Sequence, residues 1–488
     1  MRRRSCWLLS SLLVALGLTA QAQPQGEAAS LLRARAEAPV EPRPEDGAMN
    51  RGLEAGERLF FMTGVDNASC VRSVTDVTGD GRDEIVVGID ESQTDNIFLL
   101  DGASSGPATV VWAIETVDGA SGGSPWGDQA LVPVSDTDGN GRQNILLGTA
   151  WGGRTAYDLD SLDGTIHWRF DTYTTVESGW IYSLAQLDDI TGDGVPEAAF
   201  GAGSDNDKVY MVDGASSGPA TVLWEYQAAD AVLSVRDLGD ANGDGDHDVL
   251  AAIGDNGQQL VLLDGGTASP SGQVLWTYPA GATVAACGVL PDVTGDGVPE
   301  ALAVLWTSDG SAIRCLNGAS GALVWSSTAV ADFGMMVDVL EDVTGDGTPE
   351  VVVGSFENAV IVLSGLDGSL VWKTPVGTLN GGDVWTVRAI DDLNGDGRQD
   401  VIAGSFDYHV YAMDGDDGAV LWAFDTNNRV FSVYPVGDLN GDGRPEVVAG
   451  TQDTNDNVVV HVLAGGNAAI FADGFESGDT LAWSATVP

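Results

Sequence analysis

A nine-residue segment rich in aspartate and glycine occurs eight times between residues 76 and 446. Aspartate occupies its first position in every copy, and glycine occupies its fourth and sixth positions. Successive copies begin 46 to 60 residues apart. A repeat of about 50 residues is typical of stacked structural units or of propeller blades. We call the copies loop one to loop eight; they begin at Asp76, Asp136, Asp189, Asp240, Asp292, Asp342, Asp392 and Asp438.

The segments between these loops alternate between apolar and polar side chains, which is the period of a β-strand. In the seventh repeat this pattern predicts four short strands, A to D, at Val384 to Ile390, Asp400 to Gly404, His409 to Met413 and Ala419 to Phe424. Four antiparallel strands in each of eight repeats predict an all-β fold, an eight-bladed β-propeller. A β-solenoid is the structural alternative, although its coils usually need fewer residues per turn.

A tryptophan marks strand D in most repeats and follows a glycine at a fixed distance. The spacing is four residues in five repeats, and two further repeats contain an additional Pro-Ala. A large aromatic side chain at the same place in each blade fills the wedge between neighbouring sheets, so we expect these residues to pack between blades. They are Trp112, Trp168, Trp224, Trp276, Trp325, Trp372 and Trp422.

The eighth repeat lacks this glycine–tryptophan pattern after its third strand, Val458 to Leu463. A matching pattern occurs near the N-terminus of the chain. Gly56 to Phe60 repeats the spacing from glycine to aromatic residue, and Phe60 precedes loop one by 16 residues, as Trp422 precedes loop eight. We therefore expect the N-terminal strand to complete the last blade and to close the ring, which removes two open sheet edges. The alternative is that Ala468 to Phe471 supplies that strand.

The loops present the pattern of a calcium-binding loop. Positions 1, 3, 5 and 9 carry oxygen-containing side chains, the glycine at position 6 permits a sharp turn, and position 7 is expected to add its carbonyl oxygen. The alternative is a set of Asp-Gly or Asn-Gly hairpin turns without metal. Loop two has the fewest charges, because asparagine replaces an acid at positions 5 and 9. We predict up to eight structural Ca²⁺ ions, with these ligands: Asp76, Thr78, Asp80, Glu84, Asp136, Asp138, Asn140, Asn144, Asp189, Thr191, Asp193, Glu197, Asp240, Asn242, Asp244, Asp248, Asp292, Thr294, Asp296, Glu300, Asp342, Thr344, Asp346, Glu350, Asp392, Asn394, Asp396, Asp400, Asp438, Asn440, Asp442 and Glu446.

At these loops, over about Gly56 to Leu463, the chain resembles the FG-GAP/VCBS-type repeats of integrin-like propellers. That resemblance implies calcium between strands A and B. The strand D phrase resembles the tryptophan-docking repeat of quinoprotein (PQQ-like) eight-bladed propellers, as at Ala412, Asp414, Gly418 and Trp422. Quinoprotein dehydrogenases commonly contain a pair of adjacent cysteines, and this chain has no Cys-Cys pair. We therefore expect no PQQ and do not favour a quinone-dependent dehydrogenase.

Charge and the N-terminal segment indicate where the protein acts. A net charge of −51 argues against a nucleic-acid partner, because phosphates would be repelled. Residues 1–22 have the basic start, the short apolar stretch and the Ala-Gln-Ala cleavage site of a signal peptide, so we expect a secreted, periplasmic or cell-surface monomer, cleaved after Ala22, with no membrane span. Residues 23–55 are expected to be a flexible tether, 56–465 the propeller and 466–488 a C-terminal tail, which resembles a terminal motif of some exported Gram-negative proteins. The favoured state of Cys70, Cys287 and Cys315 is the buried free thiol, with a Cys287–Cys315 bridge as the alternative.

The predicted function is non-catalytic binding or surface interaction. The connections from strand D to the next strand A are longest after Trp112, Trp168 and Trp372, and each long connection carries an additional tryptophan: Trp126, Trp180 and Trp385. These three tryptophans are candidate platforms for a carbohydrate ring or for side chains of a protein partner. The alternative is that they cap the apolar ends of the channel. An enzymatic alternative is a polysaccharide lyase or another carbohydrate-active enzyme, but the sequence does not gather His167, His247, His409 and His461 into one site, so no catalytic residue is assigned.

Overall fold

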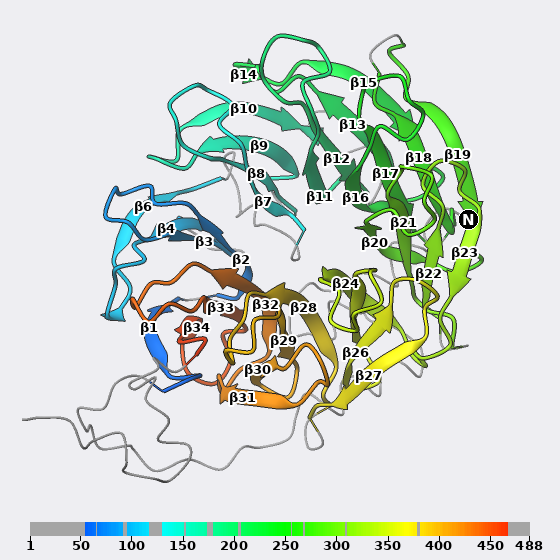
Figure 1. The fold of residues 1–488 in the computed structure, drawn as a ribbon. Coiled ribbons are helices and arrows are strands. Elements are labelled where there is room, and N and C mark those ends of the chain that lie inside the picture. The colour runs from blue at the N-terminus through cyan, green and yellow to red at the C-terminus, as the bar shows by residue number, and fades with distance from the viewer. Residues whose placement is uncertain are drawn as a thin grey trace, which may run out of the picture.

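The first seven repeats each supply the four strands of an antiparallel sheet and the eighth supplies three, because their apolar residues alternate along short strands that end at tight turns. The eight sheets are arranged in a ring like the blades of a propeller, which confirms the predicted fold (Figure 1). A channel lined by the A strands lies at its centre. The structure is a computed structural model. It describes residues 54–466 apart from 65, 91–94, 117–128, 151–152, 173–178, 204–205, 255, 267–268, 308–309 and 378–380. Within this described part, no helix is long and apolar enough to cross a membrane.

The blades are numbered along the chain, and their strands run from the channel outward in the order A to D. Blades 1 and 2 consist of β2 (Ala68–Val74), β3 (Glu84–Ile89), β4 (Ile97–Leu100) and β6 (Val110–Ile114), then β7 (Leu131–Val134), β8 (Asn144–Gly148), β9 (Thr155–Asp160) and β10 (Ile166–Asp171). Blades 3 and 4 consist of β11 (Ile181–Gln186), β12 (Ala198–Ala202), β13 (Lys208–Val212) and β15 (Val222–Gln227), then β16 (Val232–Gly239), β17 (Asp248–Ile253), β18 (Gln259–Asp264) and β19 (Gln273–Pro279).

The second half of the ring repeats this arrangement. Blades 5 and 6 consist of β20 (Val284–Leu290), β21 (Glu300–Leu305), β22 (Ile313–Leu316) and β23 (Leu323–Ser326), then β24 (Gly334–Leu340), β25 (Glu350–Ser355), β26 (Ala359–Ser364) and β27 (Leu370–Pro375). Blades 7 and 8 consist of β28 (Val384–Ile390), β29 (Asp400–Ser405), β30 (His409–Met413) and β31 (Val420–Asp425), then β32 (Val430–Val436), β33 (Glu446–Thr451), β34 (Val458–Leu463) and β1 (Arg58–Thr63).

The B strands lie at the centre of the core. All residues of β25, β29 and β33 are buried, because the neighbouring blades cover both faces of each sheet. The loops between strands A and B share one face of the ring with the turns between strands C and D. Asn317 in the C–D turn of blade 5, for example, donates to Asp296 in loop five.

The N-terminal strand closes the ring, as predicted. Strand β1 pairs antiparallel with β34, placing Phe61 opposite His461, and the Gly56 amide donates to the Ala464 carbonyl over 2.7 Å. Phe60 is 1% exposed within the core that blade 8 shares with blade 1. The competing segment Ala468 to Phe471 and the rest of the tail after residue 466 lie outside the described residues, as do the predicted signal peptide and all but the last two residues of the predicted tether.

The strand D tryptophans connect neighbouring blades, which confirms their packing role. The ring of Trp422 lies against Gly56, where an added Cβ would be 3.1 Å from the indole. In six blades the indole Nε1 donates a hydrogen bond to a backbone carbonyl just after strand C of the next blade. The pairs are Trp112 with Ser161, Trp224 with Gly265, Trp276 with Gly318, Trp325 with Gly365, Trp372 with Gly415 and Trp422 with Gly465.

The two Pro-Ala insertions form an unexpected feature. The inserted segments contain β5 (Gly106–Pro107) and β14 (Gly218–Pro219), which pair in parallel with the outer strands β1 and β10 of the preceding blades. Two sheets therefore have five strands where four were expected. A proline is tolerated here because an edge strand does not need every backbone N–H for its ladder.

The three cysteines in the described part of the chain are free and buried, as favoured from the sequence. Cys70, Cys287 and Cys315 all lie in the interior, and none of them forms a disulfide. Burial raises the pKa of both the Cys287 and the Cys315 thiols. These residues therefore act as small apolar side chains in the blade core.

A buried histidine at the closing strand pair makes a pH-dependent contribution to stability. His461 is 1% exposed, its Nδ1 lies 3.4 Å from Arg58, and its Nε2 has no hydrogen-bond partner. Burial and the Arg58 charge lower the pKa of His461 to about 3. In the unfolded chain His461 has a pKa of about 6.5. The free energy of unfolding is therefore highest above that pH, where His461 is neutral in both states, and it falls as the pH decreases toward 3, because only the unfolded state binds the proton.

We expect His461→Leu to flatten the acid side of the stability curve. Between pH 7 and pH 4.5 the wild type should lose roughly 2–3 kcal/mol of unfolding free energy that the variant keeps. The reason is that His461 takes up a proton in the unfolded wild type but not in the folded one, whereas leucine binds no proton in either state. Urea unfolding at several pH values measures this difference. Parallel curves for the two proteins would contradict the assignment.

Candidate metal centres and central channel

The aspartate at position 1 organises each loop. In loop five, Asp292 accepts hydrogen bonds from the amides of Gly295 at 2.6 Å and Gly297 at 2.7 Å. These backbone donors hold the pKa of the Asp292 carboxyl below its usual value. Gly297 has φ +92°, a conformation that other residues rarely adopt, so the sharp turn needs glycine at position 6. The same pair of bonds forms at Asp136, Asp189, Asp240, Asp342, Asp392 and Asp438.

The residue at position 9 begins strand B in seven loops, immediately precedes it in loop three (Glu197), and is buried in all eight loops. One of its side-chain oxygens accepts the backbone N–H of position 2, as Glu350 does from Val343 over 2.9 Å. The second oxygen differs between loops: Glu300 Oε2 and Glu446 Oε1 are buried and have no hydrogen-bond partner. Burial raises the pKa of Glu446 to about 8. A buried carboxylate oxygen without a partner is destabilising unless a cation compensates it.

Loops one, five and six each bring three of their predicted ligands together. The carboxylates at positions 1, 5 and 9 offer oxygen atoms that all lie within 4.8 Å of one another in loops one, five and six. These clusters are Asp76–Asp80–Glu84, Asp292–Asp296–Glu300 and Asp342–Asp346–Glu350. They can bind metal ions, and their all-oxygen ligand set suits a hard cation.

Loops two and seven lie beside potential metal ligands that are not part of the nine-residue motif. In loop two, Asp138 lies with Asp160 and His167, and in loop seven Asp396 lies with Asp414 and Asp416. The additional groups come from the ends of strand C, the C–D turns and strand D of the same blade. They were missed because they lie about 20 residues after the motif, and only the blade geometry places them beside it.

The position 1 acid of loop seven has a further partner. Asp392 lies 3.1 Å from the Arg444 guanidinium of loop eight. Arg444 also donates to the Asp392 carbonyl. This predicted calcium ligand is therefore paired with a cation from the neighbouring loop.

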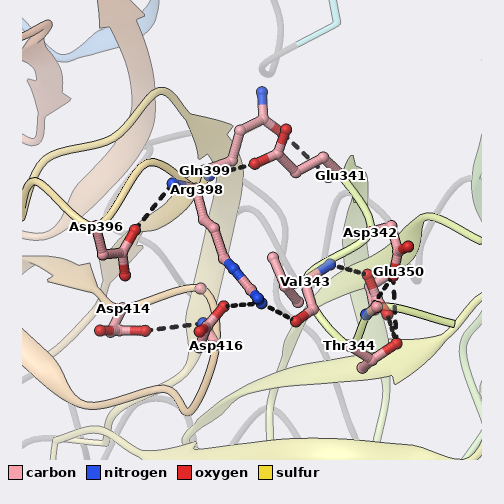
Figure 2. A network of polar contacts seen from close by, with 12 residues as sticks. Glu341, Asp342, Val343, Thr344, Glu350, Asp396, Arg398, Gln399, Asp414 and Asp416 are labelled. Atoms are coloured by element: carbon pink, nitrogen blue, oxygen red, sulfur yellow. Dashed lines mark hydrogen bonds and ion pairs between the residues drawn. The ribbon is translucent and has the colours of Figure 1, made fainter. Parts of the chain in front are cut away.

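Side chains at positions 7 and 8 connect neighbouring loops (Figure 2). Arg398 of loop seven donates to the Val343 carbonyl of loop six and to Asp416 over 2.8 Å. Gln399 and Glu341 exchange two hydrogen bonds, of 2.7 and 3.0 Å. These contacts make neighbouring loops a connected network. The arginine at position 7 was the sequence signal for it, and sequence reasoning did not use that signal.

Two of the predicted aromatic platforms, Trp180 and Trp385, are partly buried on the opposite face of the ring. Trp385 stacks on Phe406 with ring centroids 5.0 Å apart and also contacts Phe356 and Phe431. Trp180 lies edge-on to Tyr182, 6.1 Å between centroids. These contacts favour the capping role for both tryptophans. Trp126 lies outside the described residues.

A cavity of about 470 Å³ lies in the central channel and is lined mainly by A strands. Arg72, Arg236 and Arg388 line it from blades 1, 4 and 7, and they occupy the same register in their strands, opposite Val86, Leu250 and Ile402 of the B strands. Two acids, Asp237 and Asp338, also line the cavity. In a chain with 21 basic and 72 acidic residues, three arginines in one cavity are a local reversal of charge.

The guanidinium groups make contacts along the channel wall. Arg236 Nη1 donates to Gln129 Oε1 at 3.1 Å and to the Val235 carbonyl at 2.9 Å. Arg388 Nη1 likewise donates to the Val387 carbonyl, and the Arg72 guanidinium lies 4.8 Å from the centre of the Tyr434 ring. The two acids have their own contacts: Asp338 accepts the Ala389 amide at 3.0 Å, and Asp237 lies 2.9 Å from His247 Nδ1.

Comparison with known proteins supports the propeller fold and finds similarity of one segment to a known family. Residues 350–461 match the family described as the lambda-carrageenase β-propeller domain. The computationally designed Ika8 protein has a similar structure (14% identity, TM-score 0.50, 84% of this chain and 100% of that chain), as does the C-terminal WD40 domain of Sif2 (12%, 0.55, 84% and 99%). At such identities these two structures show the fold alone. No curated protein matches the sequence significantly.

Proposed function

We propose that this chain is an exported β-propeller, stabilised by calcium in FG-GAP/VCBS-like loops, that binds an anionic polysaccharide in its central channel without transforming it. The observation that carries the proposal is the group of three arginines, Arg72, Arg236 and Arg388, around one cavity. Planar guanidinium groups match the oxygens of a sulfate or carboxylate group, and such charge-assisted hydrogen bonds are stronger than neutral ones.

The negative charge of the whole chain restricts where an anionic polymer can bind. A net charge of −51 repels a polyanion at a distance, and bound calcium offsets only part of it. At physiological salt the repulsion is screened beyond about 8 Å, whereas a partly desolvated contact in the channel is screened much less. An anionic chain is therefore expected to bind at the channel and not over the outer surface.

The family match supports a carbohydrate as the ligand class. It is named for an enzyme that acts on a carrageenan, and the matched residues 350–461 include Arg388 and Tyr434, both of which line the cavity. The A strands of blades 7 and 8 lie wholly within the matched region.

A carbohydrate-active enzyme is the second candidate, because the matched family is named for one. Tyr434 beside Arg72 supplies two groups that polysaccharide cleavage uses, a phenol for proton transfer and a cation beside an acidic substituent. Release of new reducing ends from a bound polysaccharide would favour this candidate over simple binding.

The test compares sulfated and carboxylated polysaccharides with neutral ones by isothermal titration in calcium-containing buffer. We expect binding of the anionic polymers and a loss of at least about a hundredfold in a triple arginine-to-glutamine variant at Arg72, Arg236 and Arg388, since each charge-assisted bond contributes roughly 1.5–3 kcal/mol. The matched control makes the same change at Arg82, Arg169 and Arg314, outside the channel, and should bind normally. Equal weakening by both triple variants, or a preference for neutral polymers, would refute the proposal.

A further inference from the structure

Loop two differs from the other loops in how it uses position 9. Asn144 is fully buried, accepts the Thr137 amide at 3.1 Å and donates to Asp158 at 3.0 Å. Asp158 is 1% exposed and also accepts the Thr137 hydroxyl. Position 9 of loop two is therefore committed to a hydrogen-bond network inside blade 2.

Three other side chains of blade 2 converge beside this loop. Asp138 comes from loop two, Asp160 from the end of β9 and His167 from β10, and one ligand atom of each lies within 4.8 Å of the other two. Asp160 is 7% exposed, and the side chains of Asp138 and His167 are 19% and 24% exposed. The Asn140 amide nitrogen contacts both carboxylates, 3.2 Å from Asp138 and 3.0 Å from Asp160, so the two carboxylates face the same point.

The imidazole provides the second observation. His167 Nε2 lies 3.1 Å from Asp138 Oδ2, an ion pair when the imidazole is protonated, and no hydrogen bond forms at this nitrogen. A metal ion can take the place of the proton between the ring nitrogen and the carboxylate oxygen, because neutral imidazole is a common metal ligand.

We propose that blade 2 binds one divalent transition metal of the zinc class through Asp138, Asp160 and His167, in place of the calcium predicted for loop two. Zinc combines imidazole nitrogen with carboxylate oxygen ligands, whereas calcium takes oxygen ligands alone. The ion ties loop two to strands β9 and β10, and a water molecule completes its coordination. The site is independent of the proposed polysaccharide binding, because none of its three ligands lines the channel.

The test is an isothermal calorimetric titration of zinc into protein without a polyhistidine tag, in buffer that contains millimolar calcium. We expect the wild type to bind one Zn²⁺ that calcium does not displace. His167→Gln and Asp160→Asn should each weaken this binding at least about a hundredfold, the upper end of the effect of losing an outer-shell partner. The matched control is His409→Gln, which removes a histidine lying 3.5 Å from Asp407 on the opposite face and should leave zinc binding unchanged.

A spectroscopic measurement separates ligation from loss of structure. Co²⁺ in the same site should give visible absorption that His167→Gln abolishes while the variant retains its circular dichroism spectrum. Zinc binding that is equal in His167→Gln and wild type, or that millimolar calcium removes, would overturn the proposal.

Discussion

Removing calcium is expected to lower the stability of this propeller by an amount comparable to its total free energy of unfolding. Ions that bind only the folded loops stabilise by about 2.7 kcal/mol per site at a hundredfold excess over the dissociation constant. Loops one, five and six, whose carboxylates at positions 1, 5 and 9 converge, would together contribute about 8 kcal/mol. Natural domains are stable by only about 5–15 kcal/mol. The apo-protein should therefore unfold at a much lower temperature.

The physical reason is visible in the acids of the loops. Without an ion, two or three carboxylates share a tight turn, and Glu300 and Glu446 each retain a buried oxygen without a partner. Scanning calorimetry with excess EGTA, then with calcium restored, measures the effect. Magnesium should restore little, because it requires shorter and more regular coordination.

A pair of point variants localises the calcium effect. Asp292→Asn in loop five should reduce the calcium-dependent gain, whereas Asp332→Asn, which lies outside the eight nine-residue loops, should leave it intact. An unchanged melting temperature in EGTA would show that the loops are ordinary hairpin turns.

Deleting Gly56 to Met62 is expected to have a similarly large effect. The deletion removes the strand that pairs with β34, together with the buried side chain of Phe60 and the backbone of Gly56 against which Trp422 packs. Truncating a buried phenylalanine alone costs about 3–5 kcal/mol. Losing the whole strand also exposes the edge of β34, so aggregation should accompany the loss of stability.

The control for this deletion removes residues 23–53, which precede the described part of the chain. This truncation should leave the unfolding midpoint within experimental error of the wild type. A point variant, Phe60→Ala, should lie between the two deletions. If both truncations unfold at the same denaturant concentration, β1 does not close the ring in solution.

Features that are local in sequence were predicted correctly. The period of two, the Asp-Gly turns and the repeat of about 50 residues determined the strands, the number of blades and the position of the loops. Ring closure was also predictable, since the spacing from Gly56 to Phe60 repeats that from Gly418 to Trp422. Each of these signals depends on neighbouring residues of one repeat, because turns and strands form from local backbone preferences and side-chain alternation.

The tertiary structure alone decided which side chains meet. Asp160 and His167 reach loop two only because strands C and D fold back beside it, and Asp414 and Asp416 reach loop seven in the same way. Arg72, Arg236 and Arg388 are separated by more than 150 residues at each step, yet equal register in three A strands brings them to one cavity. The sequence alone determined the repeated unit and where its polar residues stand along the chain. Their meeting depends on strand register and on the closed ring, which bring together residues that are distant in sequence.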